Sequence, residues 1–182
     1  VSVMVVLWGI EALDQLLFSG ASSLDRFGIL PRELSGLKGI ILAPLLHAGF
    51  PHLIGNTVPL LVLGWFVMLR RTSEFFLVTI LGALIGGIGV WLFGDLFASA
   101  KSRHVGASGV IFAYFGFLLF RALFERSFLA ISLALITGFS YGSMIWGILP
   151  NAAYPRTSWE GHLFGFLSGA ICAKLLANDP AK

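Results

Sequence analysis

A serine between two glycines is the first candidate for chemistry in this chain. Residues 105–112 read VGASGVIF, so Ser108 lies between Gly106 and Gly109, just ahead of an apolar run. The glycines give the backbone access to positive φ and leave room for an approaching substrate. If the apolar run is a helix, Ser108 is in its first turn, where unpaired N–H groups and the helix dipole favour an oxyanion. The alternative is structural: the glycines serve helix packing and Ser108 caps the helix.

Histidine and asparagine side chains open a second apolar segment. Residues 47–56 read HAGFPHLIGN, and His52 and Asn56 are four residues apart, so a helix presents them on one face. Both can donate hydrogen bonds, as an oxyanion hole requires. The alternatives are an interhelical hydrogen bond for Asn56 and solvated loop positions for His47 and His104.

A third segment supplies a histidine beside a ridge of glycines. Residues 160–169 read EGHLFGFLSG and contain His162. The ridge follows a GxxxGxxxG spacing and is formed by Gly161, Gly165 and Gly169. Such a surface lets another helix approach closely, and Gly109 with Ala113 offers a matching one. If the two surfaces pack together, Ser108 and His162 meet at the same depth as nucleophile and general base.

The composition predicts that membrane helices carry these segments. Of the 182 residues, 57% are hydrophobic and 12% are charged, and the mean hydropathy is +0.91, well above that of a soluble domain. Six apolar segments approach the length that crosses a bilayer as a helix: residues 3–18, 52–69, 75–93, 106–124, 128–149 and 159–177. Most of their joints are short, and no repeat or linker is visible. We therefore expect an all-α membrane protein with a single domain over residues 1–182.

The first segment and the connection after it carry signals of their own. The connection, residues 20–46, is long, and much of it is apolar. We expect an element that is partly embedded in the membrane rather than a free loop. In the first segment, Glu11, Asp14 and Gln15 fall near one face. They form a proton or ion site or, alternatively, lie solvated at the helix end.

Several classes of function are disfavoured. The net charge of +3 is spread over several loops with no basic cluster, so nucleic-acid binding is not expected. The single cysteine, Cys172, excludes an internal disulfide and a cysteine-based zinc site. No HxxxH or HExxH spacing favours a metal, and no organic cofactor is predicted.

The basic residues favour one orientation in the membrane. They divide evenly between the two sides, and one set lies in short joints or close to helix ends: Arg70, Arg71, Arg121, Arg126, Lys174 and Lys182. The other set is Arg26, Arg32, Lys38, Lys101, Arg103 and Arg156. Because short cytoplasmic joints are typically basic, the first set predicts a cytoplasmic N-terminus and places Ser108 toward the outer face.

Together, the three segments resemble the signature elements of the rhomboid intramembrane serine proteases. HAGFPHLIGN, GASG and GHLFG are similar, in order, to that family's paired-histidine element, its GxSG motif and its final His-x-x-Gly, and the resemblance covers essentially the whole chain. It implies a six-transmembrane-helix rhomboid-like bundle in which Ser108 is the nucleophile and His162 the general base. It also implies an oxyanion hole formed by His52, Asn56 and the backbone N–H of Ser108.

Other positions are expected to support this site: Gly106, Gly109, Phe112, His47, Gly161 and Gly165. The resemblance gives His47 a structural role. Phe112 stands where many family members carry a tyrosine, and it can still stack on His162. Lys38-Gly39 stands where many members carry Trp-Arg in the first connection.

The resemblance also implies the substrate and the location. Family members cut transmembrane or membrane-adjacent segments of other proteins, and the chain is expected in a bacterial plasma membrane, in contact with its lipids. The oligomeric state is left open. Two alternatives stay open as well: a catalytically inactive rhomboid-like protein that binds or escorts membrane helices, and a small-solute transporter that uses Glu11 and Asp14.

Overall fold

The structure, a computed structural model, describes residues 2–18, 23–96, 100–150 and 157–177, and over these ranges the fold is helical. The α-helices are α1 (Ser2–Leu17), α2 (Gly39–Leu42), α3 (Phe50–Arg70), α4 (Thr72–Phe93), α5 (Ser108–Glu125), α6 (Phe128–Tyr141) and α7 (Trp159–Ala177). Short 3-10 helices are η2 (Leu24–Phe27), η3 (Leu34–Gly36), η4 (Ala43–Leu45) and η5 (Gly142–Ile148). The described ranges contain no strand, only an isolated antiparallel bridge between Ile29 and His104. The predicted all-α class is confirmed.

Each of the six predicted apolar segments coincides with a helix, but the count of six membrane-spanning helices is not confirmed. Four helices of the described part of the chain are long and apolar enough to cross a membrane: Phe50–Arg70, Thr72–Phe93, Ser108–Glu125 and Phe128–Ile148. The other two fall outside this set because α1 has only 16 residues and α7 carries several polar ones. Arg156 and Lys182, which entered the predicted orientation, lie outside the described residues.

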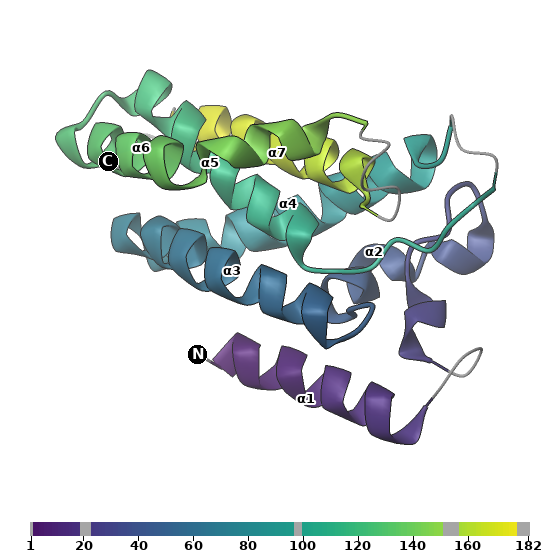
Figure 1. Ribbon diagram of the computed structural model, residues 1–182. Coiled ribbons are helices and arrows are strands. Elements are labelled where there is room, and N and C mark those ends of the chain that lie inside the picture. The colour runs from purple at the N-terminus through teal and green to yellow at the C-terminus, as the bar shows by residue number, and fades with distance from the viewer. Residues whose placement is uncertain (1, 19–22, 97–99, 151–156, 178–182) are drawn as a thin grey trace.

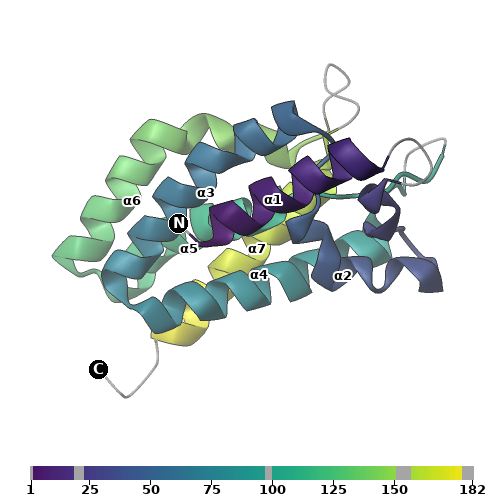
Figure 2. The same ribbon diagram turned by 90° about the horizontal axis from the view of Figure 1, so that it is seen from below.

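Helix α5 forms the centre of the bundle. It packs against α3, α4, α6 and α7, while α1 lies on the outside next to α3 (Figures 1 and 2). The buried residues of α5 include an unbroken run from Val110 to Leu118. A helix that is buried all round needs apolar or small side chains on every face, and this run supplies them. The residue that opens this helix, Ser108, is thereby fixed by the core of the protein.

Glycines bring α5 and α7 into close contact. A Cβ atom on Gly165 would collide with the carbonyl oxygen of Gly109, and one on Gly169 would collide with that of Ala113. The ridge predicted from the GxxxGxxxG spacing therefore packs on the predicted partner surface. A Cβ on Gly109 would lie 3.5 Å from the carbonyl oxygen of Gly161, so the first turns of the two helices are neighbours.

The described part of the first connection, residues 23–46, contains short helices and is tied to the end of α4. The indole Nε1 of Trp91 donates to the carbonyl oxygen of Glu33 at 2.9 Å. The guanidinium of Arg32 donates to the carbonyl oxygen of Gly94 at 2.7 Å. Figure 2 shows the short helix α2 of this connection beside α4. These contacts hold the connection against the loop that leads to Ser108.

The acidic residues of α1 are buried, which corrects the alternative that they are solvated at the helix end. Glu11 is 1% exposed and accepts a hydrogen bond from the Gln15 side chain at 2.9 Å. Asp14 accepts from the Ser23 hydroxyl at 2.8 Å and from the backbone N–H of Leu24 at 2.7 Å. Asp14 therefore anchors the first connection to α1, because its carboxylate accepts hydrogen bonds from two donors of that connection.

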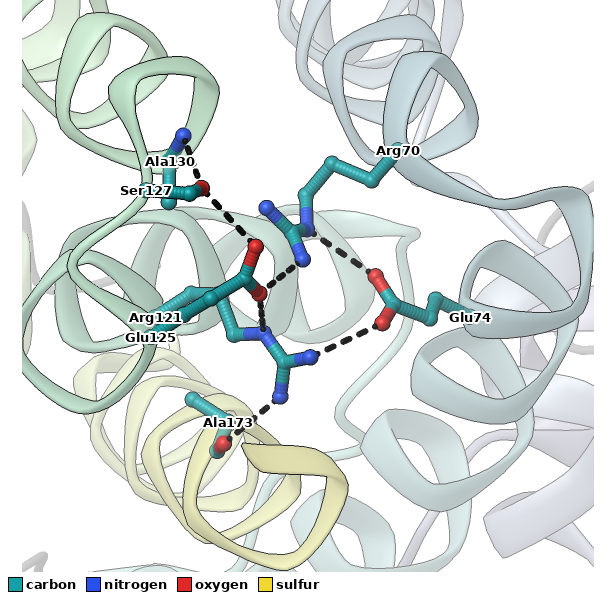
Figure 3. A network of polar contacts seen from close by, with 7 residues as sticks. All are labelled: Arg70, Glu74, Arg121, Glu125, Ser127, Ala130 and Ala173. Atoms are coloured by element: carbon teal, nitrogen blue, oxygen red, sulfur yellow. Dashed lines mark hydrogen bonds and ion pairs between the residues drawn. The ribbon is translucent and has the colours of Figure 1, made fainter. Parts of the chain in front are cut away.

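A buried ionic network joins the helices at the end of α5 that is remote from Ser108 (Figure 3). Arg121 is fully buried and reaches three acceptors on three helices: Glu125 at 2.8 Å, Glu74 at 3.1 Å and the carbonyl oxygen of Ala173 at 3.1 Å. Arg70 also contacts both carboxylates, Glu74 at 3.0 Å and Glu125. Within the described residues, two cations and two anions thus contact one another, which offsets the cost of burying their charges.

Candidate active site

Ser108 is the first residue of α5 and lines a small cavity. The chain reaches it through Gly106, whose φ of 118° lies in the region that favours glycine. The cavity has a volume of about 50 Å³ and is bordered by the first connection, by glycines of α4 and by residues that precede and begin α5 and α7. As a first-turn residue, Ser108 has a backbone N–H with no acceptor inside its own helix. The nucleophile candidate therefore has an N–H that its own helix does not use and a cavity beside it.

His162 lies in the first turn of α7, and its ring is held on two sides. Nδ1 is 3.0 Å from the carbonyl oxygen of Gly147, which can only accept, so Nδ1 carries the proton of this bond. The ring stacks on Phe112 with the centroids 4.1 Å apart and 8° between the planes, as expected for a phenylalanine at this position. In the neutral ring these contacts leave Nε2 as the proton acceptor, which is the form a general base needs.

The first turns of α5 and α7 are neighbours, but His162 is not among the described residues that border the cavity lined by Ser108. Phe112 lies one turn after Ser108 on α5, and its ring covers that of His162. Within the described residues, no hydrogen bond joins the Ser108 hydroxyl to His162. Catalytic hydrogen bonds are often longer without substrate and tighten in the reacting complex.

His52 and Asn56 of α3 converge on the backbone beside Ser108. A Cβ atom on Gly106 would lie 2.8 Å from His52 Nε2 and 3.5 Å from Asn56 Nδ2, so only glycine leaves room for both side chains. The backbone N–H of Ala48 points at His52 Nδ1 at 3.4 Å, which leaves the proton of the neutral ring on Nε2. Asn56 is 7% exposed, and its Nδ2 has no hydrogen-bond partner within the described residues. Two donor side chains are thus held beside Gly106, two residues before Ser108.

His47 and His104 are buried, which corrects the alternative that both are solvated loop residues. His47 is 1% exposed, and its Nε2 accepts a hydrogen bond from the backbone N–H of Ala107 at 3.4 Å. Burial, with a smaller contribution from nearby His52, lowers the pKa of His47 to about 4. Because its ring is neutral near pH 7, His47 can accept this bond and support the turn that precedes Ser108.

Sequence reasoning missed two contributors to this site. The first is Gly147, which acts through its carbonyl oxygen, and a backbone acceptor leaves no signal in the residue types. The second is Ser158, whose hydroxyl lies 2.6 Å from His104 Nδ1 and accepts from the backbone N–H of Gly161 at 3.2 Å. A serine directly before an apolar helix is a helix-capping signal. Nothing in the sequence, however, links Ser158 to His104.

Comparisons with known proteins point to one family. The sequence model of the family described as Rhomboid domain matches residues 35–179, a range that contains every site residue named above. Uncharacterized protein Rv1337 of Mycobacterium tuberculosis is 40% identical over 98% of this chain and 74% of its own length. Uncharacterized protein ML1171 of Mycobacterium leprae is 39% identical over 98% of this chain and 70% of its own length. A Bacillus subtilis protein provisionally named rhomboid protease YdcA is 32% identical over 72% of this chain and 63% of its own length.

Proposed function

The chain belongs to the rhomboid family, and from that premise we propose that it is an intramembrane serine protease acting through Ser108 and His162. Ser108 Oγ attacks the carbonyl carbon of a peptide bond in or near a transmembrane segment while His162 Nε2 takes the hydroxyl proton. His162 passes this proton to the leaving amine nitrogen, and the C–N bond breaks to leave an ester on Ser108. A water molecule then attacks the ester and gives a proton to His162, which passes it to Ser108 Oγ as the acyl C–Oγ bond breaks and the carboxyl product leaves.

The observation that carries this proposal is the unpaired amide of Asn56. A buried donor without an acceptor is costly, so it persists where an acceptor forms during function. The negatively charged oxygen of the tetrahedral intermediate is such an acceptor. We infer that Asn56 Nδ2, His52 Nε2 and the backbone N–H of Ser108 stabilise it together.

Replacement of Asn56 by alanine tests this role. We expect kcat to fall by about 10²–10³-fold with little change in KM, since the lost bond forms mainly in the transition state. Steady-state cleavage of a transmembrane substrate in detergent measures both constants. The matched control is Thr57→Val on the same helix, because the Thr57 hydroxyl bonds to Leu53 and Trp8 instead of facing the site. An equal loss in both variants would show that Asn56 acts only through helix packing.

We infer that all six apolar segments, including α1 and α7, cross the membrane. The basic residues favour a cytoplasmic N-terminus, which leaves Ser108 toward the outer face of a bacterial plasma membrane. A site near the surface supplies the water that hydrolysis needs and that the hydrocarbon core lacks. Transmembrane proteins are the proposed substrates, and the surrounding lipids are the other partner.

A regular substrate helix is expected to resist cleavage. Its backbone is internally hydrogen-bonded, so a peptide bond must leave the helix before Ser108 can reach it. A transmembrane reporter with Gly-Pro near the cut site should therefore be cleaved faster than an all-leucine segment of the same length. Cleavage rates of the two reporters in the same proteoliposomes measure this difference. Equal rates would contradict the need for unwinding.

The second candidate is an inactive rhomboid-like protein that binds or escorts membrane helices. The absence of a hydrogen bond between Ser108 and His162 in the described structure is the observation that favours it. A fluorophosphonate probe separates the two, because it forms a bond only with an activated serine. Labelling of the purified protein supports the protease, and no labelling of folded protein supports the escort.

A further inference from the structure

We propose that His104 is a positioning residue that ties the start of α7 to the loop before Ser108 and so sets the distance between Ser108 and His162. This inference rests on the proposed function, because it assigns a role within the same site. The hydroxyl of Ser158 lies 2.6 Å from His104 Nδ1. His104 is four residues before Ser108, and Ser158 is four residues before His162. The hydrogen bond between His104 and Ser158 therefore links the segment before Ser108 to the segment before His162.

His104 is itself anchored in the fold. Its backbone pairs with Ile29 of the first connection in both directions, at 2.9 Å and 3.0 Å. Its Nε2 lies 3.3 Å from Asp95 Oδ2, an electrostatic contact that is not aligned as a hydrogen bond. A carboxylate at this distance favours a proton on Nε2, so Nδ1 is left to accept from the Ser158 hydroxyl. His104 as a whole is 8% exposed, so its ring is largely shielded from water.

Ser158 connects His104 to the first turn of α7. Its Oγ accepts from the backbone N–H of Gly161 at 3.2 Å, and its carbonyl oxygen accepts from the N–H of His162 at 3.2 Å. The Glu160 carboxylate adds a second tie, since it accepts from the backbone N–H of Asp95 at 3.1 Å. The first turn of α7 is therefore bonded to the loop that leads to Ser108 at two points.

The His104–Ser158 bond acts where the glycine contacts between α5 and α7 are loosest. Gly165 and Gly169 hold α7 tightly against α5 beyond His162, whereas the contact at the first turns is looser, since a Cβ on Gly109 would still lie 3.5 Å from the carbonyl oxygen of Gly161. A shift of about 1 Å between reacting groups is enough to cost roughly 10²-fold in rate. The His104–Ser158 bond lies at the end where the reacting groups are, and both residues line the same cavity as Ser108.

The test compares His104→Phe, Ser158→Ala and their combination with wild type. His104→Phe keeps a ring but removes both nitrogens, whereas Ser158→Ala removes the hydroxyl. We expect each single variant to lower kcat by about 10- to 100-fold with KM changed less than about twofold, and the double variant to be no worse than either. Ser158→Thr keeps the hydroxyl and should retain activity. Ser127→Ala is the control, because Ser127 caps α6 in the same way without touching the site.

Amide hydrogen exchange over residues 159–164 gives a second readout that needs no activity. Exchange there should rise about tenfold or more in both single variants and stay unchanged in Ser127→Ala. Additive losses in the double variant, a change in KM alone, or unchanged exchange would each overturn the positioning role. If the wild-type protein is not labelled at Ser108, the proposed protease function fails instead. Amide hydrogen exchange over residues 159–164 would then test alone whether the His104–Ser158 bond holds the start of α7.

Discussion

Replacement of Ser108 by alanine is expected to abolish fluorophosphonate labelling and to lower peptide-bond cleavage by about 10⁴-fold or more. Alanine removes the atom that forms the covalent bond, and the two neighbouring donors cannot replace it. His162→Ala should have a similar effect, since a serine hydroxyl is a weak nucleophile without a base to take its proton. The measurements are labelling of purified protein in detergent and cleavage of a reconstituted transmembrane substrate.

Ser140→Ala is the matched control for these variants, because Ser140 is exposed on α6, away from the cavity. It should be labelled and active like the wild type. The double variant Ser108→Ala with His162→Ala should be no worse than either single one, as expected for two residues that act as a unit. Labelling that survives in Ser108→Ala would place the nucleophile elsewhere and would refute the proposed site.

Removal of Arg121 is expected to give the largest loss of stability in this chain. Arg121→Met would remove one of the two cations that contact the buried carboxylate of Glu74, which is 5% exposed. Breaking a buried ion pair on one side costs about 3–5 kcal/mol of unfolding free energy. Thermal or denaturant unfolding in detergent, followed by circular dichroism, measures the change. Arg121→Lys should lose part of this energy, because one ammonium cannot reach the three acceptors of a guanidinium fork.

Arg71→Met is the matched control, since Arg71 is exposed and, within the described chain, only its backbone forms hydrogen bonds. Its stability should lie within about 0.5 kcal/mol of the wild type. The double variant Arg121→Met with Glu74→Gln restores the charge balance and should recover part of the loss. A loss in Arg121→Met no larger than that in Arg71→Met would show that the network contributes nothing measurable.

The sequence was sufficient to predict where the helices lie and two of the contacts near Ser108; the roles of the site residues remain a proposal. Runs of apolar residues located each of the six segments, because hydropathy dominates in a membrane chain. The four-residue spacing of Gly161, Gly165 and Gly169 predicted the surface that meets Gly109, since that contact depends only on the absence of side chains. The i,i+4 spacing of His52 and Asn56 likewise predicted their common face.

What could not be predicted depends on the path of the loops. His47 and His104 are polar loop residues by sequence, yet the folded first connection buries them. Asp14 was ambiguous for the same reason, since its partners Ser23 and Leu24 belong to that connection. Gly147 contributes a carbonyl oxygen, a group that every residue carries. Tertiary contacts of irregular backbone determine all of these features, and no periodic pattern encodes them.

The pairing within the ionic network has a consequence for how the chain enters the membrane. Arg70 and Glu74 are four residues apart across the α3–α4 junction, and Arg121 and Glu125 are four apart on α5. Each insertion unit, the α3–α4 hairpin or the α5 helix, therefore brings one cation with its own counterion. A charge at the centre of the bilayer costs about 2.5–3.5 kcal/mol. These four residues lie at or near helix ends, so we expect the pairing to save each unit less than that during insertion. The cross-contacts of Arg121 with Glu74 and of Arg70 with Glu125 then form only as the inserted units assemble.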